Sequence, residues 1–164
     1  MSAQTTYNYT STIGTAGGLV DLSPYAIDTF LNEEETGNML FGVGVVQGST
    51  PGTNVALPTE AATADVFEGV TTNNRTTEYD MEGKTHINEG AAIGVLRYGK
   101  IYVRVAADVE PAYGDALYLI TSGDEAGYFT NSDTGTVAVK GRFIGGVDTA
   151  SQIAAVELFN QAQA

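Results

Sequence analysis

The sequence predicts an all-β domain, an antiparallel β-barrel or sandwich, with an extended N-terminal arm. Two observations lead to this fold class. Apolar residues alternate with polar ones or form short runs, which are the patterns of half-buried and fully buried strands. Gly, Asn, Asp and Pro separate nearly all of these runs, at the spacing typical of antiparallel sandwiches and barrels. We therefore expect an arm over residues 1–38 and a single all-β domain over residues 39–164.

The expected strands begin where the arm ends. Residues 39–46 read as a buried strand loosened by two glycines, and the turn signal at 48–52 ends it. The later expected strands are residues 66–71, 84–88, 92–97, 100–106, 116–121, 127–130, 136–139, 142–147 and 153–159.

The arm shows no sustained hydrophobic period and is rich in Thr, Ser, Gly, Asn and Tyr. One short helix is expected in it, because Ser23 and Pro24 resemble an N-cap followed by proline, and apolar residues at 27, 30 and 31 follow at helical spacing. Fully extended at roughly 3.3 Å per residue, the arm could reach about 120 Å.

Charge excludes several classes of partner. The formal net charge is −13, and residues 1–74 contain no Lys or Arg. A phosphate backbone or an anionic membrane would repel such a chain, so we expect neither nucleic acid nor membrane as a partner. No apolar run approaches the roughly 20 residues of a membrane span. The first residues lack the blocks of a signal peptide, so synthesis in the cytoplasm is expected.

Three of the seven basic residues lie within residues 94–105, inside a β pattern. From residue 100 onward aliphatic positions alternate with polar ones, and the polar face carries Lys100, Tyr102 and Arg104. One face of this strand therefore enters a core, and the other is free to meet a partner.

Residues 97–100 can be read either as a tight hairpin turn or as a glycine bend within one continuous strand. Tyr98 is a poor occupant of a positive φ, which favours the bend, with Gly99 as the bending residue. The nine tyrosines, without any tryptophan, fit either an interface or an ordinary exposed sheet about equally well.

Catalytic and metal-binding signals are weak. The absence of cysteine rules out disulfides, thiolate catalysis and cysteine-ligated zinc, and the lone His86 reads as an ordinary sheet residue. Acidic pairs are abundant, so a glycosidase-like pair stays as a rival interpretation. Residues 123–135 resemble part of a calcium loop but lack its closing glutamate, and two hairpin turns explain them better. We expect no enzyme, no metal and no cofactor.

Short motifs occur along nearly the whole chain. They are residues 32–33, 40–46, 48, 50–52, 67–70, 94–103, 109–115, 127–130, 141–145 and 156–160. In their order and spacing these motifs resemble the structural cement proteins that decorate tailed-bacteriophage capsids. Tyr98 and Tyr102 stand where that family often has tryptophan.

The resemblance implies a noncatalytic decoration protein, made in the host cytoplasm. It would bind the outer capsid surface of the virion as a homotrimer and bridge neighbouring major capsid protein subunits. Three copies would carry three times the formal charge of −13, so the interfaces between them must be apolar or must pair opposite charges. We expect the basic strand within residues 94–105 to lie at such an interface, with its Lys and Arg side chains paired with carboxylates of a neighbouring subunit. The expected trimer or capsid interface residues are Tyr7, Tyr9, Tyr25, Phe41, Arg97, Tyr98, Lys100, Tyr102 and Arg104.

Three rival functions remain open from the sequence. A carbohydrate-binding or fibre-like β module of the virion would use exposed aromatic residues on a sheet face. An acid-pair hydrolase would use two of the many carboxylates. An assembly factor would be absent from the mature particle.

Overall fold

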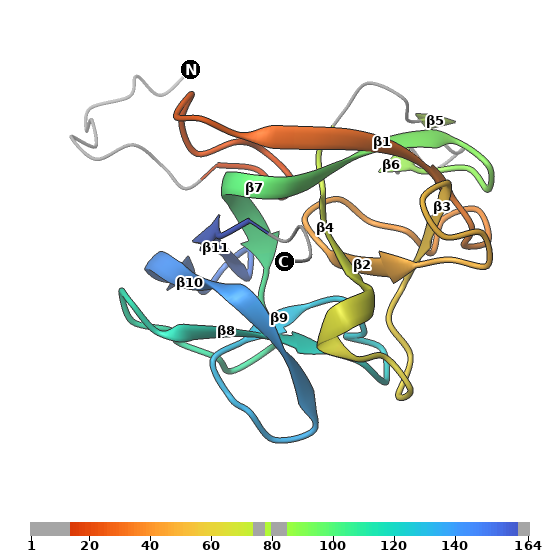
Figure 1. Ribbon diagram of the computed structural model, residues 1–164. Helices are drawn as coiled ribbons and strands as arrows, with labels where there is room; N and C mark the ends of the chain where they lie inside the picture. The colour runs from red at the N-terminus through yellow and green to blue at the C-terminus, as the bar shows by residue number, and fades with distance from the viewer. Residues whose placement is uncertain (1–13, 74–77, 80–84, 161–164) are drawn as a thin grey trace, which may run out of the picture.

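The computed structural model describes residues 14–73, 78–79 and 85–160 and confirms an all-β fold (Figure 1). Its regular elements are β1 (Ala26–Asn32), β2 (Gly44–Gln47), β3 (Asn54–Ala56), the 3₁₀ turn η1 (Ala64–Val66), β4 (Phe67–Thr71), β5 (Glu78–Tyr79), β6 (Thr85–His86), β7 (Ala92–Arg104), β8 (Ala116–Ile120), β9 (Phe129–Thr130), β10 (Thr136–Asp148) and β11 (Ile153–Leu158).

Five strands close into a small barrel. They follow the order β1-β3-β2-β4-β7, and β1 also pairs with β7, so this part of the sheet has no open edge. The pairing of β1 with β3 is parallel, and the other pairings of the barrel are antiparallel. Because free backbone groups at a sheet edge invite aggregation, closure protects this end of the molecule.

The long strand β7 leaves the barrel and continues into a second group of strands. Its later residues pair with β11, which is followed by β10, β8 and β9. The chain after β7 returns to β9 through a bridge between Val105 and Phe129, and the N–H of Gly44 donates to Gly127 O at 2.8 Å. Figure 1 shows these strands below the barrel, with β7 passing from one part to the other.

Two hydrophobic cores share one wall. The strands β2 and β7 form this wall, because each contributes to both cores: Val45, Ile93 and Val95 belong to the barrel core, and Val46, Leu96 and Ile101 belong to the larger one. The barrel core consists of Phe30, Met39, Val43, Val45, Val55, Ile87, Ile93 and Val95. The larger core lies between the shared wall and the second group of strands, and its largest fully buried members include Phe129, Phe143, Leu119 and Leu158.

The helix predicted near residues 23–31 is wrong, because this segment contains the strand β1. Phe30 and Asn32 are buried while Leu31 between them is exposed, which is the alternation of a strand. Pairing with β7 and β3 supplies the backbone hydrogen bonds that a helix would have made internally. Ser23 does not cap a helix, since its N–H donates to the Asp21 carboxylate at 3.0 Å.

Other predicted boundaries were also wrong. The strand expected at 39–46 begins only at Gly44, because a turn at Phe41 and Gly42 precedes it, with Gly42 at φ 72°. The short strand β3 was missed. Residues 136–139 and 142–147 form the single strand β10, which stays continuous through two irregularities in its pairing.

The choice between a hairpin turn and a bend at residues 97–100 is settled in favour of the bend. β7 runs through Gly99 as one strand of 13 residues, and Gly99 has φ 124°. Among the described residues, no helix is long and apolar enough to cross a membrane.

Candidate interface around the Gly99 bend

Gly99 marks the place where three distant parts of the chain meet. A Cβ at this position would lie 2.8 Å from Tyr25 Cβ and 3.5 Å from Pro24 O, so a side chain would collide with the segment that leads into β1. The positive φ is a second reason for glycine. On the other side, Gly99 pairs with Leu158 of β11. The bend therefore brings the N-terminal segment, β7 and the C-terminal strand together.

The segment before β1 follows the second half of β7. Gly17 N–H donates to Tyr102 O at 2.8 Å, and Tyr102 N–H donates to Gly18 O at 2.9 Å. One step further, Val20 N–H donates to Lys100 O at 3.1 Å. Gly14 lies against the ring of Tyr102 and leaves no room for a side chain of its own. These contacts hold residues 14–20 beside β7 and cover Tyr102.

A row of charges crosses the sheet beside the bend. Lys100 Nζ lies 2.9 Å from Asp21 Oδ2, and the strand register places Glu157 of β11 opposite Lys100. Arg142 of β10 lies next in the row, with its Nε donating to Glu157 Oε2 at 2.9 Å. The Arg142 guanidinium in turn lies 5.6 Å from the ring centre of Tyr113, within the range of a cation–π contact. Two acids and two bases alternate here, so the row is neutral.

The row shifts the ionisation of its members. Hydrogen bonds from the Ser23 hydroxyl and from Lys100 lower the pKa of Asp21 to about 2. The hydrogen bond to Asp21 raises the pKa of Lys100, and the hydrogen bond to Glu157 raises the pKa of Arg142. These pKa shifts keep Asp21, Lys100 and Arg142 charged across the neutral pH range.

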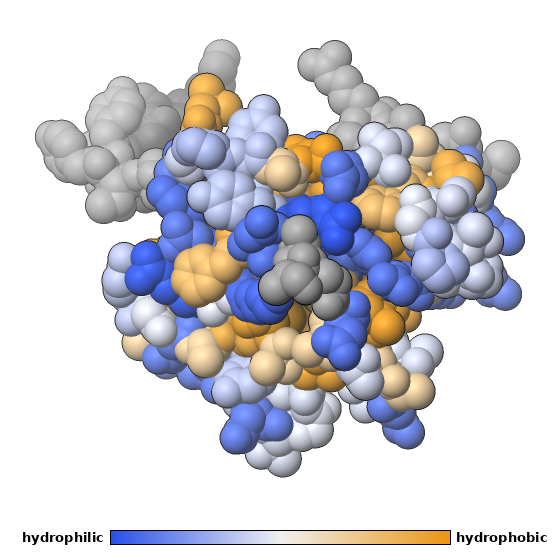
Figure 2. Space-filling model, in the orientation of Figure 1, coloured by the Kyte–Doolittle hydropathy of each residue, from blue (hydrophilic) through white to orange (hydrophobic). Residues whose placement is uncertain are grey.

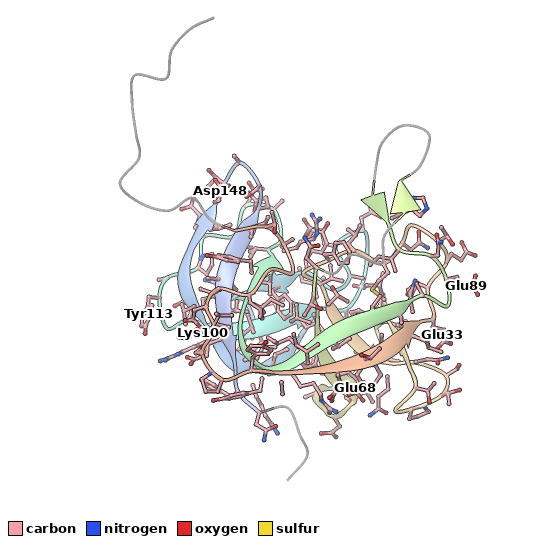
Figure 3. All side chains as sticks on the ribbon, turned by 90° about the horizontal axis from the view of Figure 1, so that it is seen from above. Glu33, Glu68, Glu89, Lys100, Tyr113 and Asp148 are labelled. Carbon is pink, nitrogen blue, oxygen red and sulfur yellow. The ribbon has the colours of Figure 1, made fainter. Side chains whose placement is uncertain are left out.

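Exposed aromatic residues surround this neutral row. Tyr98 directly precedes the bend, and the pairing of Gly99 with Leu158 places Phe159 beside it; these two residues are 42% and 45% exposed. Tyr25 is 48% and Tyr113 is 69% exposed. Figure 3 shows Lys100 and Tyr113 on one side of the molecule, away from Glu33 and Glu89. We call this surface the bend face: Asp21, Leu22, Tyr25, Tyr98, Lys100, Tyr113, Arg142, Glu157 and Phe159.

The bend face is distinctive within the described part of the chain. In the described part of the chain, seven large hydrophobic residues are exposed. Five of them belong to the bend face, and the other two are Ile27 and Leu31. Figure 2 shows apolar side chains interspersed with hydrophilic ones on the face in view, as expected of an ordinary protein surface.

The structure brings some of the predicted interface residues together and separates others. Tyr25, Tyr98 and Lys100 lie on the bend face. Tyr102 is half-buried beneath residues 14–18. Arg104 and Phe41 meet at a different place, where Arg104 Nε donates to Phe41 O at 3.0 Å. Tyr7 and Tyr9 lie outside the described residues.

Arg97 points to another part of the molecule. It lies where β1 and β4 begin, with its guanidinium 3.1 Å from Glu68 and 3.4 Å from Asp28. The Glu68 side chain is only 7% exposed, so Arg97 neutralises a buried carboxylate. The predicted pairing of the strand's cations with carboxylates of another subunit stays a prediction. Arg97, Lys100 and Arg104 each already have a partner in their own chain.

Sequence reasoning missed Tyr113, Arg142, Glu157 and Phe159. The motifs at 109–115, 141–145 and 156–160 contain all four, but the strand register that assembles them was not readable from the sequence.

Two places bear on the catalytic and metal-binding alternatives: His86 and a surface hollow. His86 is half-buried in β6, opposite Glu78, and no group of three or more His, Asp or Glu side chains is placed to hold a metal ion in the described part. An open hollow of about 390 Å³ lies beside β10. Its lining contains a single carboxylate, Glu60, and therefore no acid pair.

The exposed aromatic residues around a neutral charge row give this closed β body a surface with the composition typical of a protein contact. The model of a family described as "Structural cement protein (E217 gp24/Pam3 gp6)" matches residues 3–159. This chain belongs to the structural cement protein family. Membership assigns it a structural role associated with the bacteriophage capsid.

A solved structure described as the capsid of Myoviridae phage XM1 contains a chain of the same fold. The TM-score is 0.72 at 20% identity, and the match covers 99% of this chain and 100% of the other. At this identity the similarity shows the fold alone. No curated protein matches the sequence.

Proposed function

We propose that this chain is a noncatalytic cement protein. It binds the outer surface of the capsid as a homotrimer, bridges neighbouring major capsid protein subunits and stabilises the shell. The observation that carries the proposal is the family match over residues 3–159. The capsid protein chain of phage XM1 supports it, because its fold extends over the full length of both chains.

The stabilising mechanism is mass action. A protein that binds the closed shell better than separated subunits adds its binding free energy to the assembled state. At a free concentration of 100 times Kd, each site adds about 2.7 kcal/mol. Because a shell has many such sites, the summed binding free energy is large.

The architecture suits a clamp. A bridge between subunits transmits force only if its own body does not deform. The shared wall of β2 and β7 ties the two cores together, and the barrel is closed by the pairing of β1 with β7. Close-packed protein interiors have low compressibility. The body therefore acts as a stiff spacer between its contact surfaces.

The direct test uses capsids prepared without this chain. Purified protein is added, the particles are imaged by electron cryo-microscopy, and the temperature of shell disruption is measured. We expect ordered density on the outer surface and a higher disruption temperature than in the same capsids without the protein. Unoccupied shells at saturating protein, or occupied shells with an unchanged disruption temperature, would contradict the proposal.

One observation favours a second candidate, a carbohydrate-binding or fibre-like module of the virion. Tyr25, Tyr98 and Tyr113 are exposed together on the bend face, and exposed rings are the usual platform for a sugar. A glycan array decides this candidate. Binding that is lost in Tyr113→Ala would support it, and an array without hits would remove it.

A further inference from the structure

We infer that the bend face is the contact between copies of this chain, so that its occupant is the bend face or an adjoining surface of a second copy. The inference deepens the proposed function and rests on its homotrimer. The starting point is the electrostatic cost of bringing together copies that each carry a formal charge of −13. Like charges resist association over distances of about a Debye length, near 10 Å at 0.1 M salt.

Self-association therefore needs a surface that adds no repulsion of its own. On the bend face Asp21 pairs with Lys100 and Glu157 pairs with Arg142, at 2.9 and 2.8 Å, and the four charges cancel. Around a three-fold axis the row of each copy can meet the row of the next, and because the signs alternate, the acids of one copy can lie against the bases of its neighbour. Complementary potentials of this kind fix the register of an interface and exclude wrong partners.

The exposed apolar side chains of the bend face supply the surface area that an interface between copies needs. At about 200 Å² per aromatic side chain, the exposed fractions of Tyr25, Tyr98, Tyr113 and Phe159 amount to roughly 400 Å². Leu22, which is 88% exposed, adds to it. A stable interface takes about 800 Å² from each partner, of which slightly more than half is apolar. The bend face thus holds the apolar share of one standard interface.

The amino-acid composition of the bend face also matches that of protein–protein interfaces. Tyrosine, phenylalanine and arginine are enriched at protein interfaces, whereas unpaired charges are depleted from their centres. A basic or polar capsid surface would be matched better by the acidic remainder of the chain than by this neutral face. The observations therefore favour a second copy over a capsid subunit as its occupant.

The test measures the mass of the isolated protein in solution by light scattering, without any capsid. We expect three times the chain mass of 17.1 kDa for the unaltered protein. Tyr98→Asp should weaken association at least tenfold. Leu31→Asp is the matched control, since Leu31 has nearly the same exposure, 40% against 42%, lies in a strand and is outside the bend face. The control should keep the mass of the unaltered protein.

Two further measurements protect the test against a misfolded variant. Tyr113→Ala alters a 69% exposed side chain and should weaken association without loss of the circular dichroism spectrum. Raising the salt concentration should strengthen association of the unaltered protein, because salt screens the repulsion between acidic bodies more than it affects an aromatic, neutral contact.

Three outcomes would overturn the inference. The first is an unaltered protein that stays monomeric at high concentration. The second is an equal loss of association in the Leu31 and Tyr98 variants, and the third is an unchanged mass in Tyr113→Ala. If Tyr98→Asp instead stays trimeric and loses capsid binding, the face contacts the shell. The assignment to a second copy then fails while the proposed cement function stands.

Discussion

Breaking the ion pair between Arg97 and Glu68 should destabilise the fold far more than breaking the exposed contact between Arg97 and Asp28. Glu68 is 7% exposed at its side chain, and its Oε2 has no hydrogen-bond partner in the described part of the chain, so the ion contact at 3.1 Å is its compensation. Two unit charges at that distance interact by about 5 kcal/mol at an effective dielectric constant of 20. Removing one partner of a buried pair typically costs about 3–5 kcal/mol.

We therefore expect Arg97→Met to lower the free energy of unfolding by about 3–5 kcal/mol, measured by urea denaturation at pH 7. For a chain of this size the melting temperature should fall by roughly 6–20 °C. Asp28→Asn removes the weaker contact, whose carboxylate is 54% exposed, and should cost less than about 1 kcal/mol. A double variant, Arg97→Met with Glu68→Leu, should recover most of the loss, because no buried charge remains.

Comparing the two single variants tests whether the burial of Glu68 determines the cost of removing its partner. If Arg97→Met costs no more than Asp28→Asn, or if the double variant is no more stable than Arg97→Met alone, the reasoning from burial is refuted.

Two further predictions concern a glycine and a carboxylate. Gly69→Ala should lower the free energy of unfolding by at least about 2 kcal/mol in urea denaturation, because Gly69 has φ 151° and an added Cβ would collide with the carbonyl oxygen of Leu96. The control is Gly146→Ala, which should be near neutral because an added Cβ there meets nothing within 4 Å. Equal effects of the two substitutions would contradict this account. The folded pKa of Asp21 is lowered from 3.8 to about 2, so its contribution is present above pH 4 and lost as the pH falls toward 2. Asp21→Asn should flatten that part of the stability curve, and an unchanged slope between pH 4 and pH 2 would count against the contact with Lys100.

Local patterns predicted what depends on local physics. The alternation of residues 100–104 correctly placed Lys100, Tyr102 and Arg104 on the face of β7 away from the core. The poor fit of Tyr98 to a positive φ correctly favoured a bend at Gly99. In both cases sterics and side-chain period act within a few residues, so the sequence carries the information directly.

The errors arose where distant pairing decides. Ile27, Phe30 and Leu31 fit a helical period, yet β7 and β3 recruit this segment as a strand between them. The charge row on the bend face depends on the register of β7, β11 and β10. A shift of two residues would keep Glu157 on the same face but move it away from Lys100, so the alternation within β11 does not fix this pairing.

The central claim is that this chain stabilises a capsid from outside. The most direct measurement is a reconstruction of one phage's particles with and without this chain, together with the disruption temperature of both. The account predicts trimeric density on the outer surface between neighbouring major capsid subunits, and earlier disruption of particles that lack it. Particles whose outer surface and disruption temperature are the same with and without the chain would contradict the account.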